Sequence, residues 1–151
     1  MVERTAPSSP QFVVLPRRGV LGIGGKDARE LLQNIVSNDV RRLSRDAALY
    51  ALLLTPQGKY LHDFFLVEHP DAESGSTLLI DAERERIPDL LRRLTLYKLR
   101  ADVTLADVSE RFAVAAAFGD AASTRLRLKS DAGSATPFDG GAAYVDPRVA
   151  A

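Results

Sequence analysis

Apolar residues recur along this chain with the spacings typical of helices and of strands. Five of them, spaced as on one face of an α-helix, are Ala28, Leu31, Leu32, Ile35 and Val36. Acidic Asp27 and Glu30 suit the positive N-terminal end of such a helix. We therefore predict a helix over residues 26–36, ended by Asn38 in the left-handed conformation.

Two apolar runs downstream predict a β-hairpin. Residues 49–54 and 60–68 are mainly apolar, and Thr-Pro-Gln-Gly-Lys at residues 55–59 lies between them. This composition is typical of a turn in which Gly58 supplies a positive φ.

Further strands are predicted on both sides of this hairpin. The apolar runs 12–15 and 20–23 flank a Pro-Arg-Arg-Gly segment and predict another hairpin. A polar loop over residues 70–76 precedes a strand predicted over residues 77–80.

A second helix is predicted after this strand. Asp81 is a suitable N-cap, and the helix is expected to end near Leu99. Pro88 either bends this helix or marks its true start. The alternating run 103–107 and the Ala/Val-rich run 112–118 predict two more strands.

Strands alternating with two helices predict the α+β class, a mixed sheet with two main helices on one face. Residues 1–10 are expected to be a disordered lead-in. Residues 11–110 form the main predicted domain, and residues 111–151 the start of a further, truncated subdomain. Within the latter, residues 130–142 predict a surface loop or linker and residues 143–145 a short strand.

Composition narrows the possible functions. The 151 residues, 46% of them hydrophobic, are enough for a compact core, and 20 basic and 20 acidic residues cancel, which argues against a nucleic-acid binder. The absence of cysteine excludes disulfides, thiolate nucleophiles and thiolate-ligated metal within these residues. No apolar run reaches the roughly 18 residues of a membrane span, and no signal peptide is evident. We expect a cytoplasmic protein.

Asp63 is the first candidate for chemistry, because it lies in an apolar strand. Its carboxylate could accept hydrogen bonds from a heterocyclic ligand or hold a proton with a raised pKa. Strand alternation could instead simply point Asp63 outward. Neighbouring His62 could be a proton shuttle, or an exposed or satisfied structural histidine. His69 is the second of only two histidines, so no metal site is expected.

Two further pairs of polar residues lie at the ends of the predicted helices. Asn38 and Asp39 either cap and turn the chain or project toward a pocket. Tyr97 and Arg100 lie at the end of the second helix. Arg100 suits the helix dipole and could also pair with a ligand carboxylate. We find no nucleophile–base pair.

Three segments together resemble a known family. They read RRGVLGIGGKDARELLQNIVSNDV, YALLLTPQGKYLHDFFLV and LLIDAERERIPDLLRRLTLYKLRADVTLADVS. In order and spacing they are similar to the N-terminal part of the YgfZ-type folate-binding proteins, relatives of the glycine-cleavage aminomethyltransferase (T protein, GcvT). The resemblance implies a GcvT-like folate-binding domain over residues 11–110. It also implies tetrahydrofolate as cofactor, and a role in the assembly or repair of iron–sulfur enzymes, notably those with [4Fe–4S] clusters.

The resemblance also implies site residues. Asp63, or the adjacent His62, matches the position of an acid at the reactive nitrogens of folate, where relatives often have two acids. Asn38 and Asp39 match the helix-ending motif, and Tyr97 and Arg100 match a Y-x-L-R segment. The family's Lys-Gly-Cys motif is missing, since the chain has no cysteine. We therefore expect an N-terminal portion of a longer protein, or a naturally shortened product.

The leading hypothesis is a non-catalytic, tetrahydrofolate-binding accessory protein. Its partners would be the iron–sulfur assembly machinery or client proteins, without direct contact to nucleic acid or membrane. One alternative is a folate-dependent aminomethyl or methyl transferase. The other is an interaction module that keeps the fold without the ligand.

Overall fold

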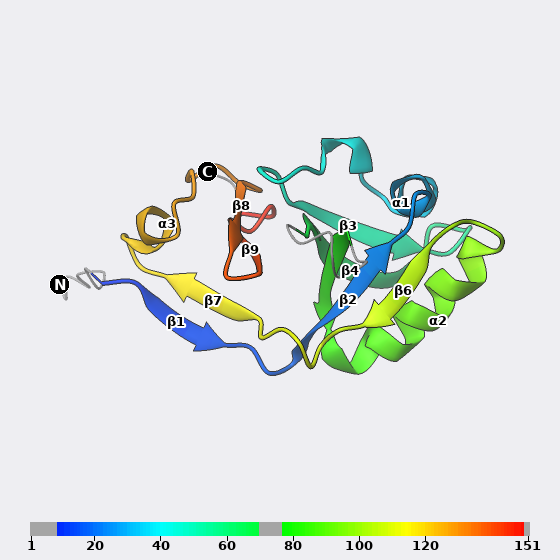
Figure 1. Cartoon of the computed structure of the whole chain (residues 1–151), viewed down its shortest axis with the longest axis horizontal. Helices are drawn as coiled ribbons and strands as arrows, with labels where there is room; N and C mark the ends of the chain where they lie inside the picture. Colours follow the sequence, from blue (N-terminus) through cyan, green and yellow to red (C-terminus); the bar gives the residue numbers. More distant parts are fainter. Residues whose placement is uncertain (1–8, 70–76, 150–151) are drawn as a thin grey trace.

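The computed structural model describes residues 9–69 and 77–149. Its centre is a five-stranded antiparallel sheet with the strand order β3-β4-β5-β2-β6 (Figure 1). The strands are β2 (Arg18–Gly24), β3 (Leu49–Leu54), β4 (Tyr60–Glu68), β5 (Leu78–Glu83) and β6 (Thr104–Asp107). The predicted loop 70–76, and most of the predicted lead-in 1–10, lie outside the described residues.

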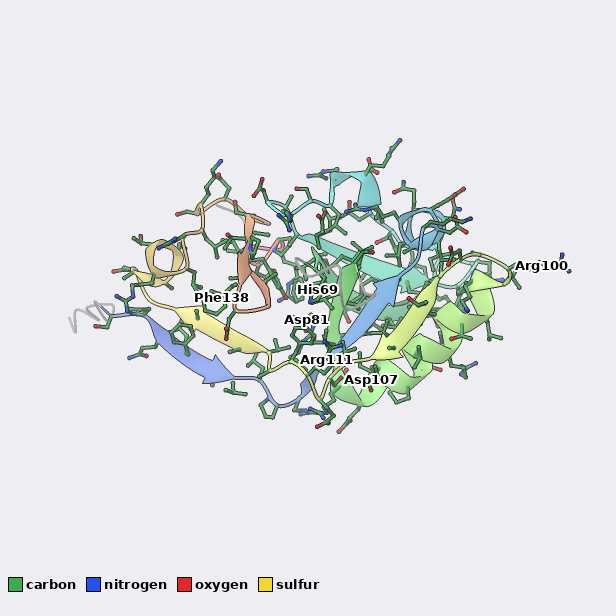
Figure 2. The ribbon with its side chains drawn as sticks, viewed as in Figure 1. His69, Asp81, Arg100, Asp107, Arg111 and Phe138 are labelled. Carbon is green, nitrogen blue, oxygen red and sulfur yellow. The ribbon has the colours of Figure 1, made fainter. Side chains whose placement is uncertain are left out.

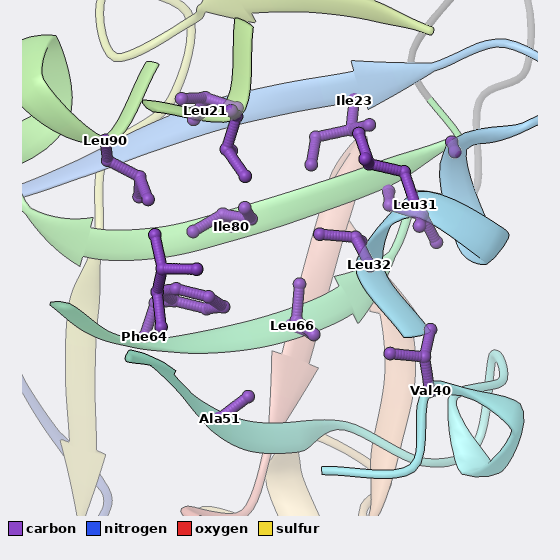
Figure 3. Packing of buried hydrophobic residues seen from close by; sticks show 14 of the residues in the cluster. Leu21, Ile23, Leu31, Leu32, Val40, Ala51, Phe64, Leu66, Ile80 and Leu90 are labelled. Atoms are coloured by element: carbon purple, nitrogen blue, oxygen red, sulfur yellow. The ribbon is translucent and has the colours of Figure 1, made fainter. Parts of the chain in front are cut away.

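Both main helices cover the same face of this sheet, as predicted. They are α1 (Ala28–Ile35) and α2 (Ile87–Lys98). Leu32 of α1 and Leu90 and Leu94 of α2 are fully buried against alternate strand residues such as Phe64 (Figure 3). Burial of these apolar side chains is the main force that holds the helices on the sheet. Among the described residues, no helix is long and apolar enough to cross a bilayer.

Truncation of Phe64 tests this core. The ring is fully buried in the helix-side cluster, so Phe64→Ala is expected to lower the free energy of unfolding by about 3–5 kcal/mol. Urea unfolding followed by circular dichroism measures the change. The same substitution at exposed Phe12 is the control, and equal losses at the two positions would contradict the assigned core.

The opposite face of the sheet carries a second, smaller layer. The hairpin of β8 (Ala135–Phe138) and β9 (Gly141–Tyr144) packs there. Its cluster contains Val20, Ala48, Val67, Leu79 and Val108, with Phe112, Val114, Ala135, Ala142 and Tyr144 packed against it. We call this side of the sheet the hairpin face. Since β8 and part of β9 lie within residues 130–142, the prediction of a surface loop or linker there was wrong.

The predicted hairpin of residues 12–15 and 20–23 was also wrong in its pairing. Both strands exist, but β1 (Gln11–Val14) pairs with β7 (Ala115–Phe118) in a separate two-stranded ribbon. The reason is that both edges of β2 are taken, one by β5 and the other by β6. A short helix that the sequence did not predict, α3 (Ala122–Arg125), follows β7.

Asp81 is not the N-cap of the second helix. It lies inside β5 and pairs with Val20 of β2. A 3₁₀ turn, η3 (Arg84–Arg86), follows, and α2 begins at Ile87 with Pro88 in its first turn. Proline is favoured there because its missing N–H has no partner to lose, so the second interpretation of Pro88 was the correct one.

The hairpin of β3 and β4 agrees with the sequence in its bounds, whereas α1 starts at Ala28 and ends at Ile35, inside the predicted range 26–36. Strands β3 and β4 begin and end where predicted, and Gly58 in their turn has a φ of 79°. The end of α1 differs. Val36 turns extended with a φ of −100° and bridges to Leu53, and Asn38 is not among the residues with positive φ. Pairing with β3, rather than a left-handed residue, therefore ends this helix.

Candidate functional site

Polar and aromatic side chains from four strands gather on the hairpin face. The residues involved are Arg18 of β2, Tyr50 of β3, Asp63 and Phe65 of β4, and Asp81 of β5. They alternate with the residues that face the helices, such as Phe64 and Ile80. Figure 2 shows Asp81 near the middle of the molecule.

The Asp63 carboxylate receives a phenol hydrogen bond on each oxygen. Tyr50 donates to Oδ2 at 2.9 Å and Tyr60 donates to Oδ1 at 2.7 Å. Partial burial raises the pKa of Asp63, but the hydrogen bonds from Tyr60 and Tyr50 and the charge of Arg18 outweigh this and leave the pKa below 3.8. The lowered pKa favours the ionised carboxylate, which is the hydrogen-bond acceptor considered from the sequence.

Aromatic rings and an arginine lie beside this carboxylate. The ring centroid of Phe65 lies 5.5 Å from that of Tyr50 and 5.4 Å from that of Tyr144. The guanidinium of Arg148 lies over both Phe65, at 4.9 Å, and Tyr50, at 5.4 Å. Asp146 holds Arg148 through both carboxylate oxygens. Because a cation is attracted to the face of an aromatic ring, these contacts hold the Arg148 guanidinium against the two rings.

Asp81 anchors the centre of the hairpin face. Arg18 donates to its Oδ1 at 2.8 Å and Tyr144 donates to its Oδ2 at 2.6 Å. Burial and the Asp81 charge raise the pKa of Tyr144 far above its ordinary value, so the phenol keeps its proton and remains a donor. This triad ties β2, β5 and β9 together.

His62 lies on the other side of the sheet from Asp63. Its ring is buried beneath α2, with Nε2 2.8 Å from Oδ2 of Asp89. The structure therefore separates two neighbours that the sequence treated as alternatives for one position. The described contacts fit the structural interpretation of His62, and we find no contact between His62 and the hairpin face.

Asp89 gives a pH test of this helix contact. Hydrogen bonds from Arg93, Arg92 and His62 lower the pKa of Asp89 below 3.8. A lowered folded-state pKa adds stability that is present above the unfolded pKa and is lost as the pH falls through the folded value. The wild type is therefore expected to lose more stability than Asp89→Asn between about pH 5 and about pH 2. The urea unfolding midpoints of both proteins across this pH range measure the difference. Parallel curves of midpoint against pH would contradict the contact.

Asn38 and Asp39 lie at the turn after α1. Asn38 donates to the carbonyl of Tyr50 at 2.9 Å and accepts from the Asp39 backbone N–H at 2.8 Å. Asp39 caps η1 (Val40–Arg42) and pairs with Arg41. Both side chains are thus used locally, and Asn38 supports the strand that carries Tyr50.

Tyr97 and Arg100 lie at the C-terminal end of α2. Tyr97 is half exposed and lines a cleft with Asn34, Leu54 and Pro56. Arg100 is exposed at one extremity of the molecule, away from Asp81 (Figure 2). The structure does not bring these two residues together with Asp63, since they lie on the helix side.

Two clefts of the described chain lie away from Asp63. One contains Tyr97, and another lies between β1, α3 and β8 and is lined by Phe12 and Phe138. Within the described ranges, no three His, Cys, Asp or Glu side chains are grouped to hold a metal. On the hairpin face, the partly exposed Asp63 carboxylate lies beside aromatic rings and the guanidinium of Arg148, whereas Phe65 and Asp81 are buried.

Sequence reasoning missed most of the groups around Asp63. Tyr50, Tyr60, Tyr144 and Arg148 come from separate segments, and no local motif marks them. Tyr50 of β3 could have been found by projecting the predicted hairpin onto its two faces, whereas regular alternation would place Tyr60 of β4 on the helix side. The C-terminal groups depend on contacts across 63 residues, as for Tyr144 and Asp81.

A solved structure shares this architecture. The glycine cleavage system aminomethyltransferase T from Bartonella henselae matches with a TM-score of 0.62 and 14% identity, over 85% of this chain and 36% of that one. The chain has the aminomethyltransferase T fold. This confirms the fold expected from the sequence.

Curated fungal proteins are similar in sequence. The mitochondrial iron-sulfur cluster assembly factor IBA57 homolog of Mycosarcoma maydis is 35% identical over 74% of this chain. The protein of the same name from Aspergillus oryzae is 32% identical over 68%. The chain spans 30% and 26% of the lengths of these two relatives. No family model matches the chain.

Proposed function

We propose that this chain acts in iron–sulfur cluster assembly and binds tetrahydrofolate on its hairpin face. The observation that supports the assembly role is the similarity to the IBA57 homologs, with 35% identity to the protein of Mycosarcoma maydis. Partners would then be the iron–sulfur assembly machinery or its client proteins. Location in the cytoplasm remains a prediction from the sequence, and the names of the two fungal relatives place those proteins in mitochondria.

The Asp63 carboxylate supports the folate part of the proposal. A carboxylate has about four lone-pair sites, and Tyr50 and Tyr60 use one on each oxygen. One site on each oxygen is left for a ligand that donates two adjacent N–H groups, as the pyrimidine edge of a pterin does. The partly exposed rings of Tyr50 and Tyr60 add aromatic surface, and Arg148 adds positive charge for an anionic ligand. The residues present therefore fit tetrahydrofolate, which would supply the one-carbon chemistry when bound.

A genetic experiment tests the assembly role. Depletion of the gene in its source organism is expected to lower the activity of enzymes that carry [4Fe–4S] clusters. Re-expression of the natural gene product should restore these activities, whereas the same product with Asp63→Ala should not. Unchanged activity of the cluster enzymes after depletion would contradict the assembly role, and full rescue by Asp63→Ala would contradict the part assigned to folate.

A folate-dependent aminomethyl or methyl transferase is the second candidate, because the chain shares the fold of an aminomethyltransferase. Turnover of tetrahydrofolate to a one-carbon derivative, with an aminomethyl or methyl donor, separates the two. We expect binding without turnover. Turnover that depends on Asp63 would favour the transferase, and a flat folate titration would favour an interaction module without ligand.

A further inference from the structure

Strand β4 contains a β-bulge near its start, directly before the candidate site. Leu53 of β3 pairs with His62, but Leu54 pairs with Tyr60, so Leu61 has no partner in the ladder. An extra residue of this kind shifts the alternation of the strand. Leu61 packs against the helix-side core, and Tyr60 therefore emerges on the hairpin face, where it reaches Asp63.

Arg86 holds this bulge from the turn before α2. Its Nη2 donates to the carbonyl of Leu61, the residue that the bulge leaves unpaired. Its Nη1 donates to the phenol oxygen of Tyr60 at 3.0 Å, and its guanidinium lies 5.5 Å from the centre of the Tyr60 ring. A single side chain thus fixes both the irregular backbone and the phenol.

The phenol of Tyr60 passes this restraint on to Asp63. It accepts from Arg86 and donates to Oδ1 of Asp63 at 2.7 Å. Accepting from a cation polarises the phenol and strengthens the bond that it donates. The order of contacts is therefore Arg86, Tyr60, Asp63, with the carboxylate at the end that faces the proposed ligand.

We infer that Tyr60 and Arg86 are positioning residues for the Asp63 carboxylate. The bulge turns Tyr60 toward Asp63, Arg86 locks the phenol, and the phenol fixes the plane of the carboxylate so that one acceptor site on each oxygen stays open. The part of this inference that concerns a ligand rests on the proposed function. The part that concerns Asp63 itself does not.

The exposure of Tyr60 makes the inference testable without unfolding the protein. Its side chain is 52% exposed and lies outside both buried clusters, so Tyr60→Phe removes one hydroxyl from a surface position. Arg86→Gln removes the charge and keeps part of the length. Arg111→Gln is the matched control, because Arg111 is exposed and lies on a separate segment (Figure 2).

The experiment is a carboxyl ¹³C NMR titration of Asp63 in the full 151-residue chain. Tyr60 hydrogen bonding helps to lower the pKa of Asp63, so Tyr60→Phe should raise that pKa and Arg86→Gln should raise it less. Because Arg86 acts through Tyr60, the double variant should titrate like Tyr60→Phe alone. Arg111→Gln should titrate like the wild type.

Tetrahydrofolate titrations of the same proteins give the second readout. Loss of one hydrogen bond to a charged group predicts that Tyr60→Phe weakens binding by about tenfold. An Asp63 titration that Tyr60→Phe does not change, or strictly additive shifts in the double variant, would overturn the inference. If the wild type fails to bind tetrahydrofolate, the proposed function fails, and the carboxyl titration still decides the positioning role.

Discussion

Asp63→Ala is expected to weaken tetrahydrofolate binding by about 100-fold while the fold is retained. The substitution removes both free acceptor sites, and two hydrogen bonds to a charged group at about 1.5 kcal/mol each account for a change of this size. Asp63 is partly exposed on the hairpin face, so its loss leaves the helix-side core unchanged. Isothermal titration calorimetry measures the affinity, and circular dichroism checks the fold.

A matched control separates the site from a general effect of charge. Asp120→Ala removes the same group from an exposed position after β7, and its affinity should equal that of the wild type. Equal affinities of the wild type and Asp63→Ala would refute the assignment of this residue. A flat titration of the wild type would refute folate binding itself.

Asp81→Ala is expected to cause the largest loss of stability among the polar positions, about 3 kcal/mol in the free energy of unfolding. The substitution leaves the Arg18 guanidinium and the Tyr144 hydroxyl without their buried partner. A charge left unpaired costs more than the ion pair contributes, because its desolvation is no longer compensated. Urea unfolding measures this loss.

Tyr144→Phe calibrates that measurement. It removes only the donor and keeps the ring against Phe65, so a loss of about 1 kcal/mol is expected. If Asp81→Ala lowers the free energy of unfolding no more than Tyr144→Phe does, the triad of Arg18, Asp81 and Tyr144 does not hold the sheet as described.

Local chemistry explains which parts of the fold the sequence predicted well. The apolar spacing of α1 and the turn around Gly58 depend on residues within one segment, and the structure reproduces both. Asp81 shows the limit of this reasoning. An acid before a helical pattern resembles an N-cap, but Asp81 belongs to β5, which pairs with β2 and β4. Its side chain contacts Arg18 and Tyr144, each 63 residues away.

The same distinction applies to the candidate site. Strand alternation indicates that Asp63 and His62 face opposite sides, and the structure places them so. The Leu61 bulge cannot be read from alternation, since a regular strand would place Tyr60 on the helix side. The pairing of β1 with β7 is likewise non-local. Folate contact by Asn38, Asp39, Tyr97 and Arg100 remains a prediction from the family resemblance alone, and the site proposed on the hairpin face does not include these residues.

The most direct test of the central claim is an amide NMR titration of the full chain with tetrahydrofolate. The account predicts saturable shifts at Tyr50, Asp63 and Phe65, and at Tyr144 and Arg148 beside them. The cleft at Tyr97 should be unaffected. Shifts confined to that cleft, or no saturable shift at any residue, would contradict a folate site on the hairpin face.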